Sequence, residues 1–239
     1  MTRLFCISTW LVIAVVVAGW PQLALSQDKE PDALSAPEIL KRMVDTYATC
    51  DTYSDSGTVE TVYHLEGGEK EKVEKQFSTA MIRPDRFRFE YTDSERPKSR
   101  YLIWRKGDDV RTWWDVTKKN ERPKTLSLAL AGATGVSGGS AHKIPALMMP
   151  NEIGGRTLKN LKRPKLDDEQ KLDDKDCFVI DAQFANQPIK IWIDKTRLLV
   201  LRIDQTSTYD DFSTVETTLY EPKVNEDVDE DQLIFDPPK

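Results

Sequence analysis

Histidine and cysteine are scarce in this 239-residue chain, which contains two histidines and three cysteines. Neither His64 nor His142 has a second histidine or a cysteine at the spacing of zinc ligands, so no metal site is expected. A serine nucleophile would need one of the same histidines as its base. Ser137 precedes His142 in a Gly-rich segment, and no strand leads into its G-x-S-x-G pattern at 135–139, so this pattern does not predict a hydrolase. We expect a protein that is not an enzyme and needs no cofactor.

Positive charge is also in short supply. The chain has 34 Lys and Arg residues against 40 Asp and Glu residues, a net charge of −6, and Arg3 is the only charged residue among the first 26. Nucleic-acid binding depends on lysines and arginines that release counterions from phosphates, so nucleic acid is excluded as a partner. The Gly-rich segment is not followed by Gly-Lys-Ser/Thr, which excludes a phosphate loop. The acidic run Asn225–Asp231 lacks the central glycine and final glutamate of an EF-hand loop, so we interpret it as a solvated tail.

The first apolar run lies near the N-terminus, from about Trp10 to Trp20. It follows Arg3, is short for a membrane span of about 20 residues, and is followed by the small residues Ala24 and Ser26. This pattern is typical of a secretory signal peptide, which we predict over residues 1–26. The alternative is an uncleaved membrane anchor. The sequence therefore predicts an exported protein of the periplasm or cell envelope.

The chain after the predicted signal peptide is long enough for one domain with a sizeable core. Residues 27–34 are polar and predict a flexible leader, and residues 35–239 predict a single domain. Two cysteines remain in it, Cys50 and Cys177. In an oxidising compartment two cysteines of one domain can form a disulfide, which we expect here. Two separate buried thiols are the alternative.

The spacing of apolar residues changes once along the domain. Ser35 and Glu38 form a capping-box pattern, and apolar residues at helical spacing predict a helix over 36–49. From Gly57 onward the period is two, as in strands. We predict strands over these ranges: 58–65, 73–82, 86–91, 101–104, 110–116, 177–184, 189–194, 198–206 and 214–220. Two short helices, 124–132 and 142–149, are expected around the Gly-rich joint. The result is an α+β fold with about nine or more antiparallel strands.

The strand that starts at Arg86 alternates charged and aromatic residues. Phe87, Phe89 and Tyr91 share one face, and Arg86 and Arg88 share the other, which we expect to lie in water. Other large apolar residues fall on the neighbouring strands and on the middle helices: Trp104, Trp113, Trp114, Leu128, Leu130, Leu147, Met148 and Met149. These residues predict either an ordinary core or the wall and cover of an apolar pocket. The residues alone leave both interpretations open.

Five features follow one another along the chain. They are the motif Arg83-Pro84-x-x-Phe87-x-Phe89, the Trp104 strand, the Gly107-Asp108 turn, the aromatic strand 110–114 and the final Phe-Asp-Pro-Pro at 235–238. This arrangement resembles the LolA-like family of periplasmic lipoprotein carriers, the outer-membrane lipoprotein-sorting proteins. The resemblance implies a curved, incompletely closed antiparallel sheet whose concave face is covered by helices, with lipoprotein acyl chains held between the two. It also implies that Arg83 bonds to the lid helices and that residues 124–150 form the lid.

The resemblance therefore predicts a non-enzymatic binding protein for acyl chains or a similar apolar ligand, monomeric, with membrane-bound proteins as further partners. The expected cavity residues are Phe87, Phe89, Tyr91, Trp104, Trp114, Leu128, Leu147 and Met148. The chain departs from the family's pattern because it stops at Lys239, without the carrier's extra C-terminal segment, which argues against transfer between membranes. The alternative is an envelope sensor or interaction module on the same fold with a filled core.

Overall fold

The computed structural model describes residues 34–94 and 99–237 of the chain. The predicted signal peptide, 1–26, and all of the predicted leader except Leu34 lie outside the described residues. Within residues 34–237 the elements form one antiparallel sheet of thirteen strands with helices packed on it. The predicted α+β class is confirmed. No helix in these ranges is both long enough and apolar enough to span a membrane.

The strands come in two blocks along the chain. The first block is β1 (Thr52–Leu65), β2 (Lys70–Ile82), β3 (Arg86–Asp93), β4 (Arg100–Lys106), β5 (Asp109–Trp114) and β6 (Lys119–Glu121). The second block is β7 (Lys162–Leu166), β8 (Gln170–Leu172), β9 (Lys175–Phe184), β10 (Gln187–Asp194), β11 (Val200–Thr208), β12 (Phe212–Tyr220) and β13 (Lys223–Val224). Neighbouring strands within each block mostly follow one another in sequence, as hairpin-linked antiparallel strands do.

One long pairing joins the blocks. The order across the sheet is β6-β5-β4-β3-β2-β1-β12-β11-β10-β9-β7, with β13 beside β1 and β8 beside β9. Gly57 to Leu65 of β1 pairs with Tyr220 to Phe212 of β12, so the two blocks meet at a seam in the middle of the sheet. β6 and β7 lie at opposite ends of this order, and the sheet is open rather than closed into a barrel. The open antiparallel sheet that the resemblance implied is confirmed.

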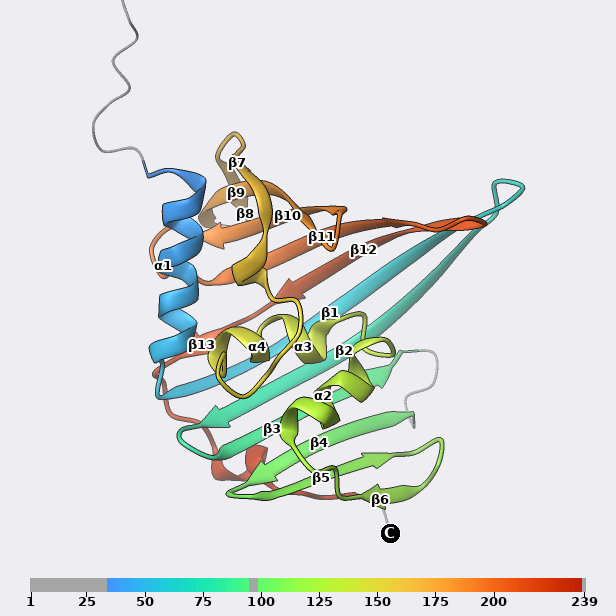
Figure 1. Ribbon diagram of the computed structural model, residues 1–239, viewed down its shortest axis with the longest axis vertical. Coiled ribbons are helices and arrows are strands. Elements are labelled where there is room, and N and C mark those ends of the chain that lie inside the picture. Colours follow the sequence, from blue (N-terminus) through green and yellow to red (C-terminus); the bar gives the residue numbers. More distant parts are fainter. Residues whose placement is uncertain (1–33, 95–98, 238–239) are drawn as a thin grey trace, which may run out of the picture. The chain divides into compact units, whose positions relative to one another are not determined.

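The helices lie on one face of the sheet (Figure 1). α1 (Ala36–Thr49) begins at the predicted capping box, in which the side chains of Ser35 and Glu38 each bond to the other residue's backbone. α2 (Leu126–Thr134) begins at Thr125, whose hydroxyl accepts a hydrogen bond from the Leu128 amide. The second predicted middle helix is two short pieces, α3 (Ser140–Lys143) and α4 (Pro145–Met148), and two 3-10 turns, η1 (Leu158–Asn160) and η2 (Glu230–Leu233), complete the fold. We call α2, α3, α4 and the residues between them the cover.

The two faces of the sheet differ in character. On the inner face, which the helices cover, Phe87, Phe89 and Tyr91 of β3 are buried in the main core together with Ile39 and Tyr47 of α1. This core continues across the seam to the isoleucines of β9, β10 and β11. The helices are therefore held to the sheet by burial of apolar surface, which stabilises by about 25 cal/mol per Å².

The outer face of β3 does not lie in water, contrary to our expectation for Arg86 and Arg88. Residues 225–237, which we call the C-terminal strap, contact this face through η2 and the residues after it. Arg86 makes two hydrogen bonds to Glu230, each 2.6 Å long, and Arg88 bonds to Asp236 at 3.1 Å. The acidic tail that we interpreted as solvated is thus paired in part with the arginines of the sheet.

The expected disulfide is absent. Cys50 and Cys177 are both buried free thiols. Cys50 belongs to the main core under the helices, whereas Cys177 packs with Val179, Trp192 and Leu201 in a separate cluster. Burial raises the pKa of both thiols, which disfavours the reactive thiolate.

Candidate ligand-binding site

Five of the eight predicted cavity residues meet in the core between the sheet and the helices. Phe87 and Phe89 are fully buried, and Tyr91 is 4% exposed. Leu147 and Met148 of α4 belong to the same cluster and are 1% and 0% exposed. The predicted wall and the predicted cover therefore belong to one continuous buried core.

Trp114 extends this wall toward the edge of the sheet. Its indole lies edge-on to Tyr101, with ring centroids 5.9 Å apart, and Tyr101 stacks on Tyr91 at 5.8 Å. The three rings share the inner face of β3, β4 and β5. Burial raises the pKa of Tyr91 to about 12, so its hydroxyl stays neutral.

Two predicted cavity residues lie elsewhere. Trp104 belongs to the outer face, where its indole nitrogen donates to the Leu233 carbonyl at 2.6 Å and its ring lies 5.8 Å from that of Phe235. Leu128 is on the solvent side of α2 and is 59% exposed. The prediction that they line the space under the cover was wrong for both residues, because it used apolar character without the register of strand or helix.

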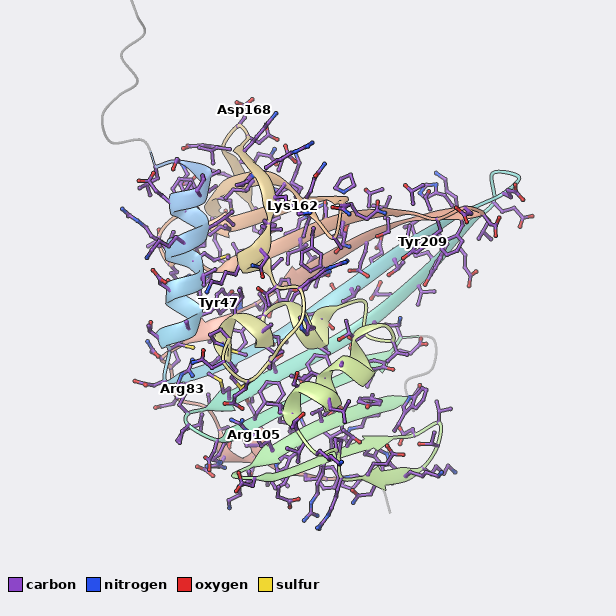
Figure 2. The ribbon with its side chains drawn as sticks, viewed as in Figure 1. Tyr47, Arg83, Arg105, Lys162, Asp168 and Tyr209 are labelled. Atoms are coloured by element: carbon purple, nitrogen blue, oxygen red, sulfur yellow. The ribbon has the colours of Figure 1, made fainter. Side chains whose placement is uncertain are left out.

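Arg83 joins three segments at one end of the cover (Figure 2). Its guanidinium donates to the carbonyls of Cys50 and Ala48 at the end of α1, the latter at 2.9 Å, and to the carbonyl of Met148 at the end of α4 at 2.7 Å. Because the last carbonyls of a helix have no partner within it, an arginine is well suited to this position. The arginine that the resemblance singled out thus bonds to both helices.

A second arginine, Arg105, fastens the same end and was missed in the sequence. It is 7% exposed and donates to the carbonyls of Pro84 at 3.0 Å and Asp85 at 3.2 Å, and it forms an ion pair with Glu152, which follows α4. Figure 2 shows Arg83 and Arg105 at the same side of the sheet. The sequence could have indicated this role of Arg105, because alternation along β4 places it on the same inward face as Tyr101 and Ile103, where a charged residue is unusual.

The Gly-rich joint is pressed against the seam at the other side of the cover. A Cβ atom on Gly138 would lie 2.6 Å from a methyl carbon of Val59 and 2.9 Å from a carboxylate oxygen of Glu216, so only glycine fits here. Next to it, Lys143 of α3 is buried and pairs with Glu216 of β12 at 2.7 Å. This ion pair ties the cover to the second block of strands.

A groove of about 610 Å³ opens beside this joint. It is bounded by residues of α2, the joint and α3 on one side and by residues of β11, β12 and the β9–β10 turn on the other. Its apolar lining includes Ala131, Phe184 and Tyr209, and its polar lining includes His142 and Arg156. The volume lies in the range typical of small-molecule sites. The groove is the place where a ligand can approach the edge of the cover.

The residues considered for catalysis have separate structural roles. The Ser137 hydroxyl donates to the Thr134 carbonyl and accepts from the Ala141 amide, whereas the His142 ring bonds to the Gly154 carbonyl. In the described part of the chain no three His, Cys, Asp or Glu residues are grouped so that they could hold a metal ion. Ser137 and His142 therefore do not form a nucleophile–base pair, and the described residues contain no group suited to bind a metal ion.

The chain is similar to several solved structures at low sequence identity. A domain from Vibrio parahaemolyticus described as an outer membrane lipoprotein-sorting protein is 11% identical with a TM-score of 0.37, over 83% of this chain and 95% of that one. In the Pseudomonas aeruginosa MucA/MucB complex, a chain is 13% identical with a TM-score of 0.46, over 84% of this chain and 61% of that one. A LolA superfamily protein from Nitrosomonas europaea is 13% identical with a TM-score of 0.28, over 85% and 99%. A search of the curated proteins found no match.

One family model matches the chain over residues 36–239, which is nearly the whole of the predicted domain. On this match the chain is a periplasmic protein and belongs to the family described as "Predicted periplasmic protein (DUF2092)".

Proposed function

We propose that this protein is a non-enzymatic periplasmic binding protein that holds an acyl chain, or a ligand of similar apolar character, between the inner face of the sheet and the cover. The observation that supports this most is the distribution of contacts at the cover. Its interior contacts with the wall are apolar, and its polar links to the sheet that the structure describes lie at its rim. When such a cover lifts, it exposes a continuous apolar surface.

The rim links explain how the closed form is kept. Arg83 and Arg105 hold the α4 end, and Lys143 with Glu216 holds the α3 end. Opening the cover separates these polar groups and exposes them to water, so each link contributes only its net hydrogen-bond or ion-pair energy, about 0.5–3 kcal/mol. A ligand has to offset these costs, and burial of its apolar surface at about 25 cal/mol per Å² does so without any catalytic group.

The route of entry is the groove beside the Gly-rich joint. Gly138 and Gly139 both have positive φ values, of 60° and 76°, so the joint uses backbone conformations that are open to glycine. A change of backbone angles here would move α2 relative to α3. An acyl chain that enters the groove would then reach Val59 and the aromatic wall behind it.

A second function is favoured by one specific observation. Phe87 and Phe89 of the wall and Leu147 and Met148 of the cover belong to one core and are 0–1% exposed. A permanently filled core is what an envelope sensor or interaction module on this fold would have, with a membrane-bound protein rather than a lipid as its partner. This module would bind no apolar ligand.

Uptake of an apolar fluorescent dye separates the two functions. The protein is expressed from its full-length gene, purified from the periplasmic fraction and titrated with the dye. We expect saturable binding that a monoacylglycerol displaces, and a several-fold change in dye affinity for Arg83→Leu. Arg83→Lys, which keeps the charge and some of the carbonyl contacts, is the matched control and should lie between the two. If neither the unaltered protein nor Arg83→Leu takes up dye, while a membrane protein is retained on pull-down, the interaction module is the correct function.

A further inference from the structure

A group of polar residues lies inside the apolar core at the seam of the sheet. Tyr53 and Asp55 come from β1, and Thr218 and Tyr220 come from β12, and all four point to the inner face. Asp55 is 7% exposed, Tyr220 4%, and Tyr53 and Thr218 0%. We call these four residues the seam cluster. Burial of a carboxyl group and three hydroxyl groups here is costly unless each of them is hydrogen-bonded.

Three oxygen atoms of the seam cluster make no hydrogen bond of normal geometry. The Tyr53 hydroxyl donates to Oδ2 of Asp55 at 2.7 Å. In contrast, Oδ1 of Asp55, Oγ1 of Thr218 and the hydroxyl of Tyr220 make no hydrogen bond of normal length and geometry within the described part of the chain, although Thr79 lies beside Asp55 and Thr218 lies beside Tyr220 closely enough to lower the pKa of each. Each unsatisfied buried group costs roughly 1–3 kcal/mol. Three weakly partnered atoms in one region mark a place where a bound molecule can supply better hydrogen bonds.

The cluster is a single site because its members face one another. The charge of Asp55 raises the pKa of Tyr220 and that of Tyr53, after the larger effect of burial on each. Gly57, two residues after Asp55 on β1, lies opposite Tyr220 across the seam, and the ring of Phe77 occupies the space that a side chain at Gly57 would fill. Phe77 also lies edge-on to Tyr220, with centroids 5.4 Å apart. The polar cluster thus has an apolar surround on the side of the aromatic wall.

The helix that covers the cluster, α1, is held by Arg83, which we call the latch because it bonds to the ends of both α1 and α4. Tyr47 of α1 lies over Tyr53 with ring centroids 5.8 Å apart, and its hydroxyl accepts from the Val200 amide. Arg83 donates to the Tyr47 carbonyl at 3.3 Å, as well as to the carbonyls described above. Release of Arg83 therefore frees the helix end that closes the seam cluster.

The charge of the cluster restricts what it can bind. Asp55 has no lysine or arginine among its ion-pair or hydrogen-bond partners in the described residues, and burial raises its pKa to about 6, an effect that Tyr53 and Thr79 partly oppose. At neutral pH the carboxylate is an acceptor without a cation. The hydroxyls of Thr218 and Tyr220 can each donate or accept. An anion would be repelled by Asp55, and a purely apolar group would leave all three atoms unsatisfied.

We propose that the seam cluster is the polar end of the ligand site and that it binds an uncharged hydrogen-bond donor, a hydroxyl or an amide, on an otherwise apolar acyl ligand. This rests on the proposed function and goes beyond it by naming the ligand class. The cluster selects acyl ligands with a neutral donor head over fatty-acid anions and over acyl esters that have no donor. The acyl chain then lies along the aromatic wall.

The test compares three ligands of the same chain length by displacement of the apolar dye at pH 8: a monoacylglycerol, an N-acyl primary amide and a fatty-acid methyl ester. For the unaltered protein we expect the first two to bind at least ten-fold tighter than the ester. Thr218→Val and Tyr220→Phe keep shape and remove a hydroxyl. Each should reduce the preference several-fold toward unity and leave the affinity for the ester unchanged. Thr206→Val on β11, a position outside the cluster, is the control and should keep the preference.

The outcomes are distinguishable. Equal affinity of the unaltered protein for all three ligands overturns the selection by the seam cluster and leaves the proposed function standing. A preference that persists in both variants overturns it as well. Failure of the dye and of every ligand to bind overturns the proposed function. A preference for the amide alone, lost in the variants, supports the cluster and identifies the donor as N–H, whereas a preference for the monoacylglycerol alone identifies it as O–H.

Discussion

The inner and outer faces of β3 and β4 are held to the rest of the protein by different forces. On the inner face, Phe87, Phe89 and Ile103 are fully buried against the helices. On the outer face, Arg86, Arg88 and Arg100 hold the C-terminal strap mainly through ion pairs. The inner contact is strong and non-directional, and the outer contact is directional and exposed at its acidic partners. The difference indicates that the two coverings serve different ends: the cover encloses apolar surface, and the strap fixes the outside of the sheet.

The largest expected effect is loss of an aromatic side chain from the inner face. Phe89→Ala should lower the free energy of unfolding by about 3–5 kcal/mol, because it removes buried surface and leaves a cavity. The matched variant on the outer face is Phe235→Ala in the strap, which should cost about 1 kcal/mol or less. Urea denaturation followed by tryptophan fluorescence measures both. Similar losses for the two variants would remove the distinction between the faces.

Loss of the latch comes next. Arg83→Leu removes donors to at least three backbone carbonyls and should lower the free energy of unfolding by about 2–4 kcal/mol. It should also speed hydrogen exchange at the amides of α4 more than at those of β10. Hydrogen-exchange mass spectrometry checks this. A uniform increase over both elements would show that Arg83 acts on global stability and not on the cover.

The next expected effect is a dependence of the free energy of unfolding on pH, which arises from Asp55 on the inner face. The pKa of Asp55 is raised from 3.8 to about 6, so its contribution to stability is full below about pH 4 and is lost as the pH rises through 6. Tyr47, Tyr53 and Tyr220 face it, and burial raises the pKa of each, so they stay neutral in this range. Asp55→Asn should therefore be more stable than the unaltered protein at pH 8, by about 2–3 kcal/mol.

The difference between these two proteins should shrink as the pH falls from 7 to 4. Urea midpoints measured at unit intervals of pH test this. A constant difference would mean that Asp55 does not titrate in this window.

The smallest effect is expected on the outer face. Glu230→Gln removes the partner of Arg86, and Asp236→Asn removes that of Arg88 and Arg100, and each change should lower stability less than any change above because these carboxylates are exposed to water. The loss should be smaller still in 1 M salt, where the Debye length is about 3 Å. Thermal unfolding at low and high salt measures it. A loss as large as that of Arg83→Leu would make the strap part of the mechanism that closes the cover.

Much of the fold could be predicted because local signals were strong. The capping box at Ser35 and Glu38 gave the bounds of α1, and strict alternation after Arg86 gave β3 and the inward direction of its aromatics. β7 was missed because it lies in a charged connector. Edge strands often contain lysines and proline, which prevent unwanted pairing with other strands. Lys162, Pro164 and Lys165 have this role in β7, and a sequence of this composition lacks the alternating pattern that predicts a strand.

The site was predictable only in part, for a related reason. The structure places Arg83 against α1 and α4 and places Leu147 and Met148 in the core, as expected, whereas the buried position of Asp55 was not predicted because the first strand was expected to begin at residue 58. Its inward position follows from the pairing of β1 with β2, in which Asp55 lies opposite Thr79. The placement of Trp104 and of the cysteines likewise depends on which face of the sheet each residue occupies, and that is set by register over the whole sheet.

Native mass spectrometry of the protein purified from the periplasmic fraction tests the central claim most directly. If the cover encloses an apolar ligand, the spectrum will show the chain with one bound molecule that organic solvent extracts, and the bound fraction will change in Arg83→Leu. A spectrum of the bare chain alone, for the unaltered protein and for Arg83→Leu, even after incubation with a monoacylglycerol, would contradict the account.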